Sequence, residues 1–130
     1  MQVLTVPTCE RCQMVDITRA VSQAVKDSQI ENGICLVYVP HTTAGVTINE
    51  NADPDVVRDM LAAFSEMVPK LPYRHMEGNS DAHIKAALIG TSQTVIIENG
   101  ALQLGTWQGI YFCEFDGPRT RKVYVQIIHT

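Results

Sequence analysis

The sequence has few basic residues and no long apolar run. It contains 10 Lys and Arg against 14 Asp and Glu, which gives a formal net charge of −4, and the basic residues are scattered. Because nucleic-acid binding needs a concentrated positive surface, we expect neither DNA nor RNA as a partner. No stretch approaches the roughly 20 apolar residues of a membrane span. Residues 1–4 also lack the features of a signal peptide, so we expect a cytoplasmic protein with no membrane partner.

The chain also has only one pair of closely spaced cysteines. Of its four cysteines, Cys35 and Cys113 lie within apolar runs, which predicts buried hydrophobic side chains. Cys9 and Cys12 have the spacing of half a zinc site or of a redox pair. Because no second such pair follows and no parallel βα unit precedes them, we favour ordinary free thiols, with metal or redox chemistry as the alternative.

What the sequence does contain is typical of one folded domain over residues 1–130. The chain is 45% apolar and 18% charged, without repeats, linkers or low-complexity segments. A chain of this length can bury a core without staples. Helical patterns occupy the first two thirds and strand patterns dominate the end. This order predicts an α+β fold with a mostly antiparallel sheet.

Apolar periodicity places the individual elements. Helical spacing predicts helices over residues 17–32, 53–68 and 81–89, with Ser80 capping the third. Alternating or apolar runs predict strands over residues 2–8, 14–15, 34–39, 42–48, 94–97, 101–104, 110–115 and 123–128. The turn signal Asp116-Gly117-Pro118 predicts that the last two strands pair as a hairpin, and residues 14–15 can pair back onto the first strand.

Three of the four histidines occupy positions that can face a common cleft. His41 follows a strand end, His75 lies in a loop, and His83 is the third position of a helix capped by Ser80. There the helix dipole disfavours imidazolium, and a metal requires neutral imidazole. Both a shared metal site and separate surface or core histidines fit this spacing. His129 has no polar neighbours in the sequence and is left out of the site.

Several polar residues near these histidines have two interpretations. Asp81 can favour the helix dipole and Asn79 can form a turn, or both can orient the histidines. Glu114 lies between apolar neighbours on a strand, so it needs a partner or a shifted pKa.

The remaining candidates are an aromatic ring and a pair of arginines. Trp107 lies between two glycines and can wall a pocket or plug the core. Arg119 and Arg121 can hold a phosphate, or they can protect an edge strand from aggregation.

Four segments together give a more specific indication. In their order and spacing they resemble the YjbQ-like family of secondary thiamine-phosphate synthases, and the resemblance runs from about Asp16 to the C-terminus. The segments are His41-Thr42-Thr43-Ala44, Gly78-Asn79-Ser80-Asp81-Ala82-His83, Gly105-Thr106-Trp107-Gln108 and Glu114-Phe115-Asp116-Gly117-Pro118-Arg119. The resemblance implies a β-sandwich-like α+β subunit with two or three helices. It also implies a homotrimer whose site lies near a subunit boundary.

The resemblance further implies roles for individual residues. A divalent metal ion, Zn²⁺ or Mg²⁺, would be held by His41, His75 and His83. The catalytic carboxylates would be Asp81 and Glu114. The substrate or its phosphate would be bound by Asn49, Asn79, Trp107, Gln108 and Arg119.

The implied activity joins hydroxymethylpyrimidine diphosphate to thiazole phosphate, giving thiamine phosphate and diphosphate. Such a reaction needs cations at the leaving diphosphate and a pocket that aligns two rings. In this family the activity is secondary, so the natural substrate can be another phosphorylated small heterocycle. The same residues would also serve metal-assisted phosphate-ester hydrolysis, or binding of a phosphorylated metabolite without catalysis.

Overall fold

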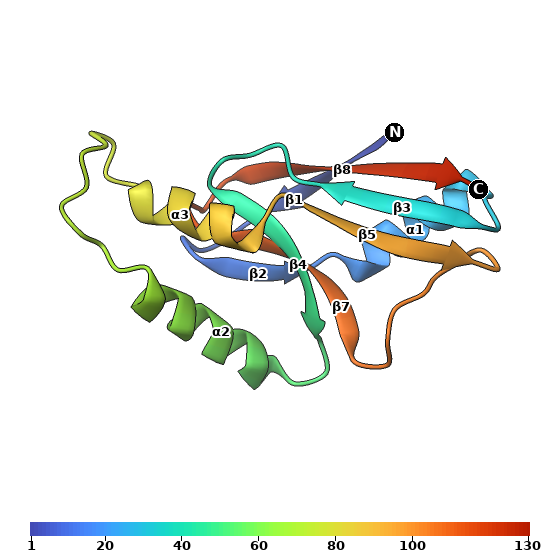
Figure 1. Cartoon of the computed structure of the whole chain (residues 1–130), viewed down its shortest axis with the longest axis horizontal. Helices are drawn as coiled ribbons and strands as arrows, with labels where there is room; N and C mark the ends of the chain where they lie inside the picture. The colour runs from blue at the N-terminus through green and yellow to red at the C-terminus, as the bar shows by residue number, and fades with distance from the viewer.

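The structure, a computed structural model of residues 1–130, consists of two antiparallel sheets and three helices (Figure 1). The five-stranded sheet has the order β1 (Gln2–Pro7), β8 (Thr120–His129), β3 (Gly33–Tyr38), β5 (Ser92–Glu98), β6 (Ala101–Leu102). The three-stranded sheet has the order β2 (Gln13–Asp16), β7 (Gln108–Glu114), β4 (Ala44–Glu50). All strand pairs are antiparallel, which confirms the predicted α+β class.

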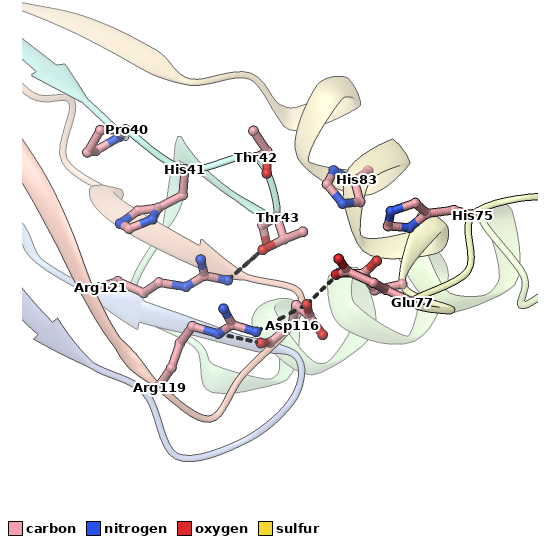
Figure 2. Close-up of a pocket in the computed structure, with 11 residues that line it drawn as sticks. Pro40, His41, Thr42, Thr43, His75, Glu77, His83, Asp116, Arg119 and Arg121 are labelled. Atoms are coloured by element: carbon pink, nitrogen blue, oxygen red, sulfur yellow. Dashed lines mark hydrogen bonds and ion pairs between the residues drawn. The ribbon is translucent and has the colours of Figure 1, made fainter.

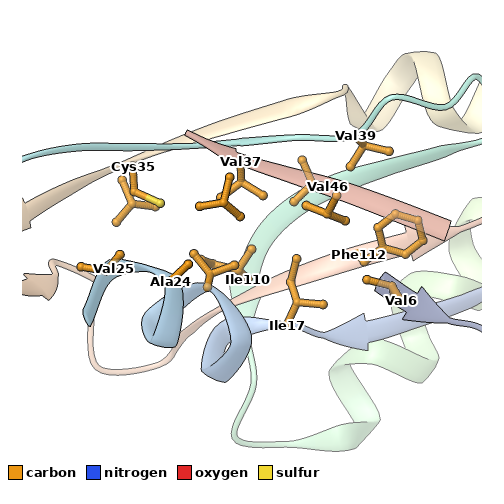
Figure 3. Close-up of a cluster of buried hydrophobic side chains, with 14 of the residues drawn as sticks. Val6, Ile17, Ala24, Val25, Cys35, Val37, Val39, Val46, Ile110 and Phe112 are labelled. Carbon is orange, nitrogen blue, oxygen red and sulfur yellow. The ribbon is translucent and has the colours of Figure 1, made fainter. Parts of the chain in front are cut away.

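The main core lies between the five-stranded sheet and a second layer made of helix α1 (Thr18–Ser28) and the three-stranded sheet. Figure 3 shows Cys35, Val37 and Val39 of the β3 segment facing Val25 and other side chains of that layer. The predicted amphipathic helix is therefore present as α1, and its apolar residues lie on the face that packs into the core.

Helices α2 (Pro54–Met67) and α3 (Ser80–Ile89) cover the other face of the three-stranded sheet. Strand β7 is therefore buried on both sides, with Phe112 in the main core and Cys113 in the core beneath these helices. The predicted start of α2 is confirmed, because the Asp53 side chain accepts a hydrogen bond from the Asp55 N–H at 2.9 Å and Pro54 follows it.

A glycine contact fixes where α3 lies on the three-stranded sheet. A Cβ atom on Gly45 of β4 would come within 2.5 Å of the Gly90 carbonyl oxygen, which follows the end of α3. The Val46 N–H donates to the same oxygen at 3.1 Å. Only glycine allows this close approach, and it anchors the C-terminal end of α3 near the end of β3, where Tyr38 pairs with Ser92.

Two predicted strand pairings are wrong. Strands β7 and β8 do not form a hairpin: β7 pairs with β2 and β4, whereas β8 pairs with β1 and β3. Strand β2 likewise pairs with β7 and not with β1. Residues 116–119 therefore carry the chain from one sheet to the other, and the apolar faces of β7 and β8 meet in the main core between the two sheets.

The four cysteines are free thiols. Cys35 and Cys113 are buried as predicted, and burial raises the pKa of Cys35 to about 11 and that of Cys113 to about 12. Cys9 is exposed and Cys12 is half-buried. None of the three helices has the length and apolar character that crossing a membrane requires.

Candidate functional site

A polar hollow of about 500 Å³ lies where the segment after β3, the start of α3 and the 116–119 connection meet (Figure 2). Eleven residues line it, and none has a large apolar side chain: Pro40, His41, Thr42, Thr43, His75, Glu77, Asn79, His83, Asp116, Arg119 and Arg121. All three histidines predicted to share a site are among them. The prediction that they face one cleft is therefore confirmed.

His41 occupies one side of the hollow together with two arginines. Figure 2 shows its ring on the same side as Arg119 and Arg121. Its Nε2 atom accepts a hydrogen bond from the Lys122 backbone N–H at 3.0 Å. Burial, and after it the positive charge of Arg121, lowers the pKa of His41 below its ordinary value.

His75 and His83 form the opposite side. Their rings lie edge to face, with centroids 5.5 Å apart and an interplanar angle of 87°. One detail of the prediction is wrong: Asn79, not Ser80, is the N-cap residue of α3. His83 is therefore the fourth helical residue. Its backbone N–H is not free, because it donates a hydrogen bond to the Asn79 carbonyl oxygen at 3.3 Å.

The three histidines do not form a metal-binding group within the single chain. No three His, Cys, Asp or Glu side chains lie close enough together to hold an ion. The reason is visible in Figure 2, where His41 lies across the hollow from His75 and His83. In addition, the Nε2 atom of His41 is already an acceptor for Lys122.

Asn79 carries the one buried polar side-chain atom without a hydrogen-bond partner. Its Nδ2 group donates to Asp116 Oδ2 at 2.9 Å, but its Oδ1 atom has no donor. A buried acceptor left in this way costs free energy unless a cation or donor reaches it. His75 and His83, which line the same pocket, offer a divalent cation two imidazoles and not the three predicted.

Arg119 is the cation with the freest access to the hollow. Its side chain is about half exposed, at 51%, and it is held at one end by Asp116. The Nε atom donates to the Asp116 carbonyl oxygen at 2.9 Å and Nη2 to a carboxylate oxygen of the same residue at 3.2 Å. The guanidinium keeps further donors that a ligand anion could accept, and its role in binding phosphate stays a prediction.

Glu114 lies beneath the hollow and does not line it. Its side chain is fully buried and ion-paired with Arg121, and it also accepts hydrogen bonds from Thr8 Oγ1 at 2.8 Å and the Asp116 N–H at 3.1 Å. Burial alone would raise the pKa of Glu114, but these bonds hold it below its ordinary value. The expected partner is therefore present, but the carboxylate has no free oxygen to offer a substrate.

Asp81, in the first turn of α3, is likewise buried and does not line the hollow. It is 2% exposed and accepts two hydrogen bonds from Arg11, at 3.0 and 3.1 Å, while Lys85 lies 3.7 Å away. The Arg11 hydrogen bonds are the main reason why the pKa of Asp81 is lowered. Neither predicted catalytic carboxylate thus reaches the pocket within this chain.

Asn49, Trp107 and Gln108 lie away from the histidines. Asn49 pairs with Gly109 and Glu50 with Gln108 at one end of the β4–β7 ladder, whereas the hollow lies beyond the other end, where Ala44 pairs with Glu114. Gly109 and Glu114 are five residue steps apart along the strand, a distance of about 17 Å. Trp107 is 63% exposed. The substrate-binding roles of these three residues remain predictions.

Sequence reasoning missed Thr8 and Arg11, which support the site. Each hydrogen-bonds a buried carboxylate that is distant in the chain, with separations of 106 residues for Thr8 and 70 for Arg11. The only local signal was that Glu114, among apolar neighbours, needs a partner. Glu77 and Asp116 line the hollow as acceptors, and neither was singled out by its spacing.

Comparison with known proteins gives consistent results across the chain. The model of the family described as "UPF0047 protein YjbQ-like" matches residues 2–130. UPF0047 protein YugU of Bacillus subtilis is 56% identical, and the match covers 98% of each chain. UPF0047 protein MJ1081 of Methanocaldococcus jannaschii is 55% identical over 95% of this chain and 90% of its own.

Solved structures agree with the fold. A protein of the YjbQ/UPF0047 family from Clostridium acetobutylicum superposes with a TM-score of 0.96 at 57% identity, covering 98% of this chain and 100% of that one. A hypothetical protein from Aeropyrum pernix K1 gives a TM-score of 0.94 at 38% identity over 99% and 98% of the two chains.

Proposed function

The chain belongs to the YjbQ-like (UPF0047) family, and we propose that it is a cytoplasmic enzyme acting on phosphorylated small heterocycles, with secondary thiamine-phosphate synthase activity. The observation that carries this proposal is the polar hollow, in which histidines and Arg119 converge without apolar lining. A surface of this composition suits a small anion better than a peptide or a lipid.

The residues of the hollow divide the work of phosphate chemistry between them. Arg119 binds and orients a phosphate with the donors that Asp116 leaves free. His75 and His83 lie on the opposite side of the same hollow, where their imidazoles can bind a cation next to a leaving diphosphate. Glu114 and Asp81 take no direct part, since each holds a wall of the hollow through a buried ion pair.

A divalent cation, Zn²⁺ or Mg²⁺, remains part of the proposal. His75 and His83 are the residues that would hold it, and it would neutralise the charge of a leaving diphosphate. Metal analysis of the purified protein and of His83→Ala checks this. The expected result is bound metal that is lost in the variant, and negligible metal in both would contradict the assignment.

The activity is tested by incubating the protein with hydroxymethylpyrimidine diphosphate and thiazole phosphate and measuring thiamine phosphate. We expect Arg119→Ala to lower kcat/KM by about tenfold to a hundredfold, the loss of one charged hydrogen bond. The matched control is Arg58→Ala, because Arg58 is exposed on α2 and pairs only with Asp55. Binding without turnover would favour a binding protein, and release of phosphate without coupling would favour a hydrolase.

We also propose that the chain forms a homotrimer through the outer face of the five-stranded sheet. Four apolar side chains on this face are exposed in the single chain: Val3, Tyr38, Ile96 and Ile128. They belong to four neighbouring strands, and Tyr38 stacks on Tyr124 with ring centroids 6.3 Å apart. Exposed apolar side chains on neighbouring strands of one sheet face are typical of subunit interfaces.

Sedimentation equilibrium tests the trimer. The expected mass is three times that of one chain, and Ile96→Lys should dissociate the assembly because it places a charge on the apolar face. Gln23→Lys, on the exposed side of α1, is the matched control. A monomeric wild-type protein would contradict the proposal.

A further inference from the structure

We infer that His41 is a neutral hydrogen-bond donor, which offers its Nδ1–H to an anionic oxygen of the ligand and is not a metal ligand. This inference rests on the proposed function in one respect, the phosphate class of the ligand. It departs from the three-histidine metal site that the sequence predicts. The evidence lies in how the end of β3 meets β8.

The first step is the backbone group that His41 meets. The pairing of β3 with β8 ends at Tyr38 and Tyr124, but β8 continues to Thr120. The N–H of Lys122 therefore lies past the last residue of β3. The imidazole of His41 takes the place of a strand partner there, with its Nε2 atom 3.0 Å from the Lys122 nitrogen.

The second step is the position of the proton. An imidazole nitrogen that accepts an N–H hydrogen bond carries no proton, so the neutral ring must be protonated at Nδ1. The guanidinium groups of Arg119 and Arg121 line the same side of the hollow and oppose an added positive charge on the ring. Glu114, which is ion-paired with Arg121, acts in the opposite direction but with less effect than Arg121.

The third step is the direction in which Nδ1–H can donate. No protein group accepts a hydrogen bond from Nδ1, and the only buried polar side-chain atom without a partner is Asn79 Oδ1. The Nδ1 group is therefore unpaired and not buried, on a side chain that lines the hollow. Beside Arg119 it adds a donor for a phosphate oxygen without adding another charge to the site.

Nuclear magnetic resonance of the ¹⁵N-labelled protein reads the proton position directly. Long-range ¹H–¹⁵N correlation separates protonated from unprotonated ring nitrogens, and His41→Asn identifies which of the four signals belongs to His41. At neutral pH we expect a protonated Nδ1 and an unprotonated Nε2. A proton on Nε2, an imidazolium ring, or broadening of the His41 signals by added Zn²⁺ at one equivalent would overturn the inference.

Two matched variants test the donor role with inorganic diphosphate in calorimetric titrations. The amide nitrogen of Asn can take the position of Nδ1, whereas the amide of Gln reaches only the position of Nε2. We expect His41→Asn to keep the wild-type affinity within about threefold and His41→Gln to lose about tenfold to a hundredfold. Equal losses in both variants, or no binding to the wild-type protein, would overturn the donor role.

Thermal melts check that both variants fold. We expect them to fold because the His41 ring lies at the rim of the structure and not in the core. The outcome also separates this inference from the proposed function. Diphosphate binding that depends on the residue at position 41, without any formation of thiamine phosphate, would contradict the synthase activity and support the role of His41.

Discussion

Two buried carboxylates hold the two walls of the hollow, and they do so differently. Glu114 supports the His41 side through Arg121, which is 3% exposed, and through Thr8. Asp81 supports the His83 side through Arg11, whose side chain is 34% exposed, and through Lys85. One network is almost completely buried, whereas the other has a partner that water reaches.

The difference shows which carboxylate the fold depends on more. Breaking a fully buried ion pair leaves an uncompensated charge in a dry interior, while a partner at the surface can be solvated instead. Glu114 also links segments of both sheets, because its partners lie on β8 and in the loop before β2. We therefore expect the two carboxylates to contribute unequally to stability, although both lie next to the histidine segments.

The largest expected effect comes from Glu114→Gln. The variant keeps the shape of the side chain but leaves Arg121 buried without a countercharge, so the free energy of unfolding should fall by about 3–5 kcal/mol. Urea unfolding followed by circular dichroism measures this loss. Glu77→Gln, an exposed residue at the edge of the same hollow, should change it by less than about 0.5 kcal/mol. A loss below about 1 kcal/mol for Glu114→Gln would show that Arg121 reaches water.

A smaller loss is expected for Asp81→Asn, about 1–3 kcal/mol in the same assay. Arg11 can turn to solvent in this variant, although Lys85 loses its countercharge. The control is Asp55→Asn, because Asp55 forms an exposed ion pair with Arg58 and should cost about 0.5 kcal/mol or less. If Asp81→Asn proved as costly as Glu114→Gln, the contrast between the partly exposed and the buried network would be wrong.

The sequence alone predicts the elements of the fold better than it predicts how the strands pair. Apolar periodicity located every helix and strand, because side-chain burial repeats locally along the chain. It could not assign β7 and β8 to different sheets, since pairing depends on β2, β4, β1 and β3 elsewhere in the sequence. Strand pairing is a long-range property, and a turn signal between two strands does not establish it.

The site was predictable to a similar extent. His41, His83 and Arg119 stand at element ends that local patterns identify, and all three line the hollow. The sequence does not distinguish Glu114 and Asp81 from catalytic carboxylates. The structure does, because Arg121 pairs with Glu114 and Arg11 pairs with Asp81. A carboxylate in the sequence carries no sign of whether a cation will neutralise it, because that cation can come from any part of the chain.

Thr8→Val makes a finer test of the buried network. The variant removes a hydroxyl that donates to Glu114 and accepts from the Arg119 N–H at 3.0 Å, so it should cost about 1 kcal/mol. The loss should shrink in the Glu114→Gln background, since part of the interaction is then already gone. Thr5→Val, at an exposed position of the neighbouring strand β1, is the matched control. Equal losses at both positions would mean that the hydrogen bonds of the Thr8 hydroxyl do not contribute to stability.

The smallest expected effect is a difference in acid sensitivity. The pKa values of Glu114 and Asp81 are lowered in the folded protein, so below the ordinary carboxyl pKa of about 4 the unfolded chain binds protons first. Their stabilisation is complete above that value and is lost as the pH falls through the folded values. Urea unfolding between about pH 5 and about pH 3.5 should therefore show a steeper fall for the wild type than for Glu114→Gln or Asp81→Asn. Parallel curves for all three proteins would mean that neither carboxylate keeps its charge more strongly in the folded state.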